Sequence, residues 1–528
     1  MTQGLSIMAK SSSGIRRGIL SRKCIIASII TTTIFSFILF IIFWCTNIFQ
    51  DTILSNLVIT NNSQSFDWFI RPPVRAVYKI HIFNYTNVED YETGKAKKLK
   101  VEDTGPYIYR ETLTRVNQVF HPNGSVSFQE KRSFQWEGGS PDDEIIVVPN
   151  VPLLAALSIM KDRSYFIRRG FSIFLSAHGI KAFVSVPARG FLWGYEDNIF
   201  TLSQSTFSQA IVPLQEKIPF DKFGVLAHKN GISGDTITIN TGADDMSKFG
   251  MIQLINGKNK SKQFWNDDKC DRIHGTQGFM FPPGTFDHPN ATIDVYSLDM
   301  CRTLSLRSHG SGTSFGIPSL TFKPPTDIFT LSPSSENYCY CPESSSGSEV
   351  TRQCPPAGLV NSSACSFNLP FLASFPHFYT GDKILREKID GLNPQAELHE
   401  SSVELHPRLG VLIGGHSRMQ MNIQAQEAPS IPHLHPIEDG QILPLIWLDV
   451  GIDNIPESML TIFKHAYFTA AAAEMSIQYG SIVGIFLPLC TLFYIIRKQR
   501  IERRAALKRN ASEMSQIKLL DAIKIANI

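Results

Sequence analysis

Two long apolar segments, one near each end of the chain, constrain what this sequence can fold into more than any other feature. The first runs from Cys24 to Trp44 and the second from about Met475 to Ile496. Each is close to the ~20 apolar residues that a helix needs to cross the hydrocarbon core of a membrane. We therefore expect transmembrane helices at 24–46 and 475–496, a large domain at 47–474 between them, and tails at 1–23 and 497–528.

The charges beside these segments predict their orientation. The first tail is basic and has no acidic residue, and the second is mostly basic from Arg497 through Arg509. Because positively charged flanks stay on the cytoplasmic side, we expect a multi-pass protein of the cell membrane with both termini in the cytosol. A cleaved signal peptide is the alternative for the first segment. It would have a shorter apolar run followed by small residues, whereas Trp44, Cys45, Thr46 and Asn47 follow here.

Potential glycosylation sites agree with this orientation. The N-x-[ST] pattern marks asparagines that accept a glycan in the secretory pathway. Asn510 also matches, but it lies on the expected cytoplasmic tail, where no glycan is added. The six matches between the two apolar segments are the predicted sites, namely Asn61, Asn84, Asn123, Asn259, Asn290 and Asn361.

Composition excludes several classes of function. The net charge of +3 comes with two basic tails, so the central domain is near neutral or slightly acidic and is not expected to bind nucleic acid. No P-loop, Rossmann fingerprint or kinase signature occurs, and no cofactor is expected. No Gly/Ser linker or internal repeat divides the central region, which favours one large domain.

Hydrophobic periodicity predicts a mixed α+β domain. Apolar residues alternate with polar ones from Tyr78 to Ile82 and from Met419 to Gln424, as in half-buried strands. The stretch 151–178 is instead rich in Leu, Ala, Ile and Phe, and it predicts two or more helices interrupted at Gly170 and ended near Gly179.

Six cysteines of the central domain are expected to form disulfides, because thiols oxidise outside the cytosol. They are Cys270, Cys301, Cys339, Cys341, Cys354 and Cys365. Six cysteines allow 15 pairings, and the spacing alone selects none of them. Zinc is the alternative ligand, but Cys339-Tyr340-Cys341 lacks the spacing of a zinc site, so no metal is expected. Cys24 at the cytoplasmic edge is a candidate for S-acylation or an ordinary residue of the span.

Two motifs could suggest catalysis. Gly312-Thr313-Ser314-Phe315-Gly316 matches the nucleophile elbow G-x-S-x-G, which needs a strand before it and a helix after it. The residues on both sides, 307–311 and 317–318, predict a loop instead. His433 and His435 lack the H-E-x-x-H helix of a zinc hydrolase and predict an exposed turn. We therefore expect no catalytic residue and no enzyme.

A series of short motifs runs in one order along most of the chain. They lie at 82–87, 105–110, 191–197, 265–270, 273–283, 299–302, 375–378, 389–394 and 419–424. In this order and spacing, and together with the paired apolar segments, they resemble the CD36 family of class B scavenger receptors, which includes the lysosomal protein LIMP-2.

The resemblance implies a fold and a disulfide pairing. The family has an antiparallel β-barrel core, a helical bundle at the apex, and a lipid-sized tunnel running toward the bilayer. The stretch at about 151–180 falls where the family places its apical helices. The pairing implied for this chain is Cys270 with Cys339, Cys301 with Cys365, and Cys341 with Cys354.

The chain also departs from the family pattern. Some members carry a lysine pair shortly before the L-W-G-Y motif, but the corresponding residues 177–180 contain no lysine. The resemblance therefore does not carry over that kind of fatty-acid recognition. Four basic residues remain in the expected apical region, and they are either an anionic ligand-binding cluster or a solvated helix face. They are Lys161, Arg163, Arg168 and Arg169.

The function implied is that of a class B scavenger receptor that binds lipids or lipoprotein-like particles and transfers lipid through its tunnel to the membrane. The alternative is a trafficking or adhesion receptor of the LIMP-2 type, with a protein partner and a lysosomal address. Leu519-Leu520 resembles a dileucine lysosomal signal, although Ser515 stands where an acidic residue is expected. The sequence thus leaves the cell surface and the lysosomal membrane open.

Overall fold

A computed structural model describes residues 2–205 and 221–526, apart from 262–263, 285, 287, 289, 336, 347–348 and 367–368. The chain divides into two compact units. Residues 1–55 and 465–528 form one of them, which we call the membrane-helix unit, and residues 56–464 form the other, the sheet unit.

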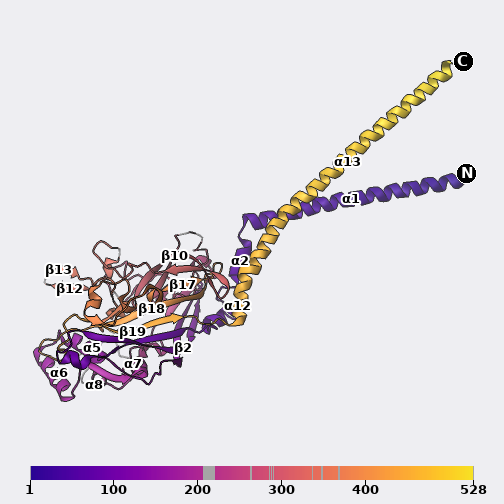
Figure 1. Ribbon diagram of the computed structural model, residues 1–528. Coiled ribbons are helices and arrows are strands. Elements are labelled where there is room, and N and C mark those ends of the chain that lie inside the picture. The colour runs from indigo at the N-terminus through magenta and orange to yellow at the C-terminus, as the bar shows by residue number, and fades with distance from the viewer. Residues whose placement is uncertain are drawn as a thin grey trace. The chain divides into compact units, whose positions relative to one another are not determined.

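The sheet unit is built on one large sheet in which fifteen strands are described (Figure 1). The main path of the sheet runs β8-β7-β3-β2-β1-β19-β18-β17-β11-β10-β9, and neighbours along it pair antiparallel. Its strands are β1 Val77–Tyr85, β2 Leu99–His121, β3 Ser125–Gly139, β6 Gly231–Ile232, β7 Ile237–Asn240, β8 Ile252–Ile255, β9 Thr292–Ser297, β10 Arg302–Ser314, β11 Ile317–Lys323, β14 Val360–Asn361, β15 Phe371–Ser374, β16 Ile389–Asp390, β17 Ser402–Leu405, β18 Leu412–Gln424 and β19 Ile442–Gly451.

Two small two-stranded sheets accompany the large one. They pair β4 Ile145–Pro149 with β5 Phe183–Pro187, and β12 Glu343–Ser346 with β13 Glu349–Arg352. The strands predicted at Tyr78–Ile82 and Met419–Gln424 are confirmed as parts of β1 and β18.

A short segment links the two ends of the strand path. Ile252 of β8 donates its backbone N–H to the carbonyl of Gly275 at 2.9 Å. The next residue, Thr276, donates to Asp294 of β9 at 2.9 Å and accepts from Tyr296 at 2.9 Å. Residues 275–276 therefore connect the edge strands β8 and β9 through backbone hydrogen bonds, which partly satisfies edges that would otherwise be unpaired.

The helices in the described part of the sheet unit are short. They are α3 Gln64–Ile70, α4 Val88–Glu92, α5 Val151–Met160, α6 Tyr165–Ala177, α7 Ala188–Trp193, α8 Asn198–Gln204, α10 Ile384–Glu387, α11 Ala396–His399 and α12 Glu457–Lys464, with 3-10 turns η1 Ala227–Lys229, η2 Met246–Lys248, η3 Tyr338–Tyr340, η4 Ser363–Cys365 and η5 Pro376–Phe378. Helices α5, α6 and α8 gather at the end of the sheet unit opposite α12, and we call it the helical end (Figure 1).

The helices predicted within 151–178 are present, but the break lies elsewhere than expected. The chain leaves the helix at Lys161 and re-enters at Tyr165, and Asn150 caps α5 by accepting the N–H of Leu153 at 3.1 Å. Gly170, the expected interruption, lies inside α6. A single glycine lowers helix stability by only about 1 kcal/mol, which packing of the helix offsets.

The membrane-helix unit contains α1 Thr2–Cys45, α2 Ile48–Ser55, the π-helix η6 His465–Thr469 and α13 Ala470–Ala526. Small residues let α1 and α13 approach closely, since a Cβ on Gly484 would lie 2.3 Å from Oγ of Ser36. Gln478 donates its side-chain amide to the carbonyl of Phe43 at 3.0 Å, and Trp44 packs edge-on against Tyr479. Close packing at small residues is how helices associate in membranes.

Candidate functional site

A large cavity lies inside the sheet unit. Its volume is about 1540 Å³, and strands from both halves of the strand path line it together with loop segments. Much of the lining is apolar, including Ile59, Phe69, Val225, Leu226, Phe249, Phe279, Leu304, Leu306, Met419, Met421, Leu448 and Val450. A space of this kind suits the hydrocarbon portion of an amphiphile.

Strand alternation brings these side chains to the cavity. Met419 and Met421 of β18 point to the same face because side chains alternate along a strand. Met419 pairs with Leu448 of β19, and Ser417, which also lines the cavity, pairs with Val450. The alternation recognised in the sequence at 419–424 thus places two methionines, which are flexible and adapt to irregular apolar shapes, on the cavity wall.

Four charged side chains meet at one wall of the cavity, three of them buried and Arg132 half-buried. Glu111 and Arg115 come from β2, and Glu130 and Arg132 come from β3, where Arg115 pairs with Glu130. Arg132 contacts Glu130 at 2.5 Å and Glu111 at 3.3 Å. Arg115 is 3.7 Å from Glu130, donates to the carbonyl of Phe69 at 2.6 Å and stacks over its ring. Each buried charge therefore has an opposite partner, as burial requires.

The two carboxyl groups of this wall respond differently to their surroundings. Burial raises the pKa of Glu111 above its usual value, despite the nearby Arg132. Burial also acts on Glu130, but the charges of Arg132 and Arg115 outweigh it and lower its pKa. Glu130 is thus held as the ionised centre of the cluster, and Glu111 is more readily protonated.

A second ion pair lies on another part of the lining. Lys229 of η1 donates to both carboxylate oxygens of Asp299, at 2.7 and 2.8 Å. Burial would raise the pKa of Asp299, but the charges of Lys229 and the adjacent His228 lower it to about 2. Burial, followed by the charge of Lys229, lowers the pKa of His228 to about 4, so its imidazole is neutral near pH 7.

Sequence reasoning missed this polar lining. The alternation Val126, Phe128, Glu130, Arg132, Phe134 along β3 was the available signal, because it places two charges on the same face as apolar residues. The ion pair between Lys229 and Asp299 could not be recognised in the sequence, because the two residues are 70 positions apart.

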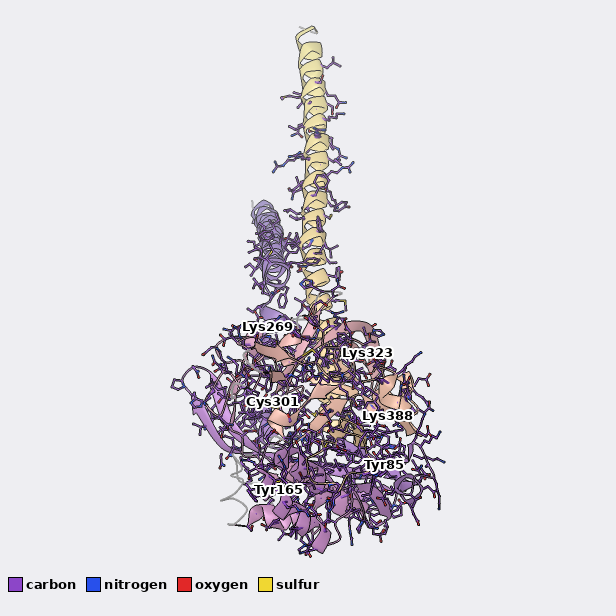
Figure 2. All side chains as sticks on the ribbon, turned by 90° about the vertical axis from the view of Figure 1, so that its left-hand side faces the viewer. Tyr85, Tyr165, Lys269, Cys301, Lys323 and Lys388 are labelled. Carbon is purple, nitrogen blue, oxygen red and sulfur yellow. A yellow bond between two sulfur atoms is a disulfide. The ribbon has the colours of Figure 1, made fainter. Side chains whose placement is uncertain are left out.

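Of the four basic residues predicted as ligand-binding, Lys161 and Arg163 lie in the turn between α5 and α6, and Arg168 and Arg169 lie near the start of α6. Lys161 and Arg169 are exposed, whereas Arg168 is half-buried and donates to the carbonyl of Arg163 at 2.8 Å. Next to them Phe166 is 84% exposed. Tyr165 of α6, also exposed, lies at the end of the sheet unit opposite Lys269 and Lys323 (Figure 2). The turn therefore presents exposed basic and aromatic side chains together.

Three disulfides join the six cysteines in the pairing that the family resemblance implies. Cys270 is joined to Cys339, Cys301 to Cys365, and Cys341 to Cys354. Trp265 packs edge-on against Tyr340 beside them and donates its indole N–H to the carbonyl of Cys301 at 3.1 Å. Cys24, Cys45 and Cys490 are free and exposed in the membrane-helix unit.

The six sequon asparagines all lie in the sheet unit. Asn61, Asn123, Asn259 and Asn290 are exposed in turns and loops, whereas Asn84 and Asn361 are half-buried in strands. In Asn84 the side-chain oxygen accepts the N–H of Val147 at 2.9 Å, and in Asn361 it accepts from Ser363 at 2.9 Å. In both residues the amide nitrogen, which carries a glycan, is not the atom used in these bonds.

The motifs that could suggest catalysis have other roles. Ser314 and Ile317 end and begin the hairpin strands β10 and β11, and Phe315 and Gly316 form its tight turn with φ of 50° and 76°. The nucleophile elbow is absent from this hairpin because a strand, not a helix, follows the serine. The preceding residues 307–311, expected as a loop, belong to β10. His433 lies in a loop near Ser176, at 3.3 Å.

The membrane-helix unit supplies both candidate membrane spans. The 22 residues Cys24–Cys45 are the apolar part of α1, and the helical stretch Glu457–Ile517 contains a second apolar window. The helix α13 continues through the predicted second tail and includes Leu519, while the side chain of Leu520 and those of the first 23 residues fall outside the described part of the chain.

These features define a class of protein, namely a membrane protein with an apolar helix near each end and a disulfide-linked sheet unit that encloses a largely apolar cavity. A model of the CD36 family matches residues 27–496. Scavenger receptor class B member 1 of Sus scrofa is 30% identical over 460 residues, covering 86% of this chain and 85% of that protein. Lysosome membrane protein 2 of Homo sapiens is 30% identical over 427 residues, covering 78% of this chain and 82% of that protein.

The chain belongs to the CD36 family. Membership places it among membrane receptors rather than enzymes, in agreement with the expectation from its motifs.

Proposed function

We propose that this protein is a class B scavenger receptor that binds lipids or lipoprotein-like particles. It then passes lipid through the sheet unit to the membrane. The observation that carries the proposal is the cavity of about 1540 Å³ with its largely apolar lining. Lipid in water is disfavoured by about 0.8 kcal/mol for each exposed CH2 group. An apolar path to a bilayer removes this barrier, and transfer down a gradient then needs no energy source.

The sheet topology supports a closed β-barrel around the cavity. The bridge at 275–276 links the edge strands β8 and β9, and closure removes edges that would otherwise be open. In the proposal the cavity is part of the lipid tunnel of the family.

The helical end is the proposed docking surface. Exposed Lys161 and Arg169 attract anionic lipid or lipoprotein surfaces, and exposed Tyr165 and Phe166 can insert their rings among lipid headgroups. The half-buried Arg168 has a structural role in this scheme, because its guanidinium binds the backbone of the turn.

A matched pair of serine-to-tryptophan variants tests the proposal. Ser417→Trp places a large side chain in the cavity, because Ser417 is exposed on β18 and lines it. Ser133→Trp is the control, since Ser133 is exposed on β3 and does not line the cavity. We expect lipid to co-purify with the wild-type protein and with the control, and Ser417→Trp to lose bound lipid and cellular lipid uptake.

The alternative function is that of a receptor for a protein partner, with trafficking to lysosomes. It would replace the proposal if mass spectrometry finds no lipid on the purified protein and Ser417→Trp leaves uptake unchanged.

A further inference from the structure

A polar zone lies within the largely apolar cavity. Its members come from two parts of the wall, and Cys301, close to one of them, lies between Tyr165 and Lys269 along the sheet unit (Figure 2). We call this zone the polar waist. It consists of Tyr78, Glu111 and Arg132 on β1, β2 and β3, and of His228, Lys229 and Asp299 on η1 and the β9–β10 turn.

The two parts of the waist lie close enough to influence each other. Burial raises the pKa of the Tyr78 phenol most, and the charges of Glu111 and then Asp299 contribute to it. Burial would raise the pKa of Asp299, but the charges of Lys229, His228 and, more weakly, Arg132 lower it. The β1–β3 wall and the Lys229–Asp299 pair also line the same cavity, so the two parts face one space.

The positive charges of the waist already have partners. Lys229 donates to both oxygens of Asp299, and Arg132 contacts both Glu111 and Glu130. An additional anion would therefore find both cations of the waist already paired. A second negative charge beside a carboxylate in a low-dielectric setting is strongly disfavoured.

Asp299 and His228 are the members open to a ligand. The side chain of Asp299 is 63% exposed, whereas that of its partner Lys229 is 13% exposed. Asp299 also lines the cavity, so the exposed part of its carboxylate can be reached from there. A carboxylate accepts more hydrogen bonds than one ammonium supplies, and the neutral imidazole of His228 offers one donor and one acceptor.

We propose, building on the proposed function, that the polar waist binds the hydroxyl end of a lipid alcohol and disfavours lipids that end in an ionised carboxylate. The hydroxyl donates to a carboxylate oxygen of Asp299 and accepts from the imidazole N–H of His228. The hydrocarbon part packs against the apolar lining, such as Leu304, Met421 and Leu448. A carboxylate in the same place would lie against Asp299, while the two cations of the waist, Arg132 and Lys229, already have acidic partners.

Two lipids that differ only at their polar end test this assignment. The full-length purified protein is assayed for binding of hexadecanol and palmitate near pH 7, and the ratio of the two affinities is compared among variants. Wild-type protein should prefer hexadecanol by about tenfold or more, since like charges brought together cost more than one factor of ten in affinity.

Asp299→Asn removes the repelling charge and leaves Lys229 unpaired. We expect palmitate to bind as well as hexadecanol to this variant, or better. His228→Ala should weaken the binding of hexadecanol several-fold and leave the binding of palmitate unchanged. Asp390→Asn is the matched control, because Asp390 is 62% exposed and lies 4.0 Å from Lys98 but does not line the cavity. It should keep the wild-type ratio.

Equal binding of both lipids to wild-type protein would overturn the inference while leaving the proposed function intact. The inference would also be overturned if Asp299→Asn showed the same ratio of hexadecanol to palmitate affinity as the Asp390→Asn control. If neither lipid binds and Ser417→Trp has no effect on uptake, the proposed function fails and the inference fails with it.

Discussion

The imidazole of His399 shows how one residue makes the sheet unit sensitive to acid. His399 is 3% exposed and stacks on His377, with ring centroids 4.5 Å apart. Its Nδ1 accepts the N–H of Gln395 at 2.9 Å, which requires that nitrogen to be unprotonated. Next to it, His377 is 3.0 Å from Asp103. Burial, followed by the charge of His377, lowers the pKa of His399 to about 4, with Asp103 opposing and Arg418 and His81 adding smaller effects.

We expect stability to fall as the pH drops from about 7 toward about 4. In this range the unfolded chain protonates His399, with an ordinary pKa of about 6.5, while the folded protein does not. Near pH 5, the protonation of His399 in the unfolded chain should lower the free energy of unfolding by about 2 kcal/mol. The variant His399→Asn keeps an acceptor for Gln395 and should therefore lose less thermal stability between about pH 7 and pH 5 than wild-type protein.

The exposed His309 supplies the control for this measurement. His309→Asn should show the acid sensitivity of the wild-type protein. A parallel decline in thermal unfolding temperature for His399→Asn and His309→Asn would show that His399 is not the group responsible.

Glycosylation is the second prediction at the scale of single residues. We expect Asn61, Asn84, Asn123, Asn259, Asn290 and Asn361 to carry glycans, and each Asn→Gln variant to run faster on a gel by one glycan. Asn510 matches the same pattern on α13 but should remain unmodified, so Asn510→Gln should not change mobility. Modification of Asn510 would contradict the expected cytosolic position of the second tail.

At the scale of helices and strands, the periodicity of the sequence predicted whether a segment is a helix or a strand better than it predicted where the segment begins and ends. The strands β1 and β18 and the helices α5 and α6 follow from alternation and from apolar composition. The residues 307–311 were expected as a loop, yet β9 and β11 pair with β10 and hold most of them in a strand. Pairing with strands distant in sequence overrides such local preferences.

The same limit applies to the candidate site. The six cysteines and the basic turn could be located from the sequence, and the family resemblance supplied a pairing. The cavity lining could not be located, because Arg132 and Asp299 reach it from strands and turns far apart in the chain. Which charges meet inside the sheet depends on the register of β2 and β3 and on the path of η1.

The packing of α1 against α13 gives a prediction at the element scale. Gly484→Leu should force the two helices apart, because a Cβ at Gly484 already meets Oγ of Ser36 at 2.3 Å. Gly480→Leu is the control, since a Cβ there has no atom within 4 Å. The contact can be followed by disulfide formation between cysteines placed at Trp44 and Tyr479, in a background without the three free cysteines.

Cross-linking should fall roughly fivefold in Gly484→Leu, as about 1 kcal/mol of lost helix packing predicts, and stay unchanged in Gly480→Leu. Equal yields in both variants would mean that the small residues do not determine how the helices approach each other.

At the scale of the whole molecule, the distribution of charge and sequons predicts one topology. The first tail is basic, Arg497–Arg509 is mostly basic, and the six predicted glycan acceptors all lie between the two spans. Positive flanks stay in the cytosol and glycans are added on the opposite side of the membrane, so the two patterns give the same answer independently. Both spans are retained in this topology, and the sheet unit lies outside the cytosol, where its six cysteines can oxidise.

Protease treatment of sealed vesicles that carry the sheet unit in their lumen tests this topology, with one tag at each terminus. Both tags should be digested without detergent, while the sheet unit is protected until detergent is added. Non-reducing peptide mapping of the protected fragment should then recover Cys270 linked to Cys339. A protected tag at either end would overturn the arrangement, and loss of the first tag before protease is added would favour a cleaved signal peptide. Because lipid transfer to the bilayer requires the sheet unit to be tethered beside it, that result would also remove one of the two anchors on which the proposed function relies.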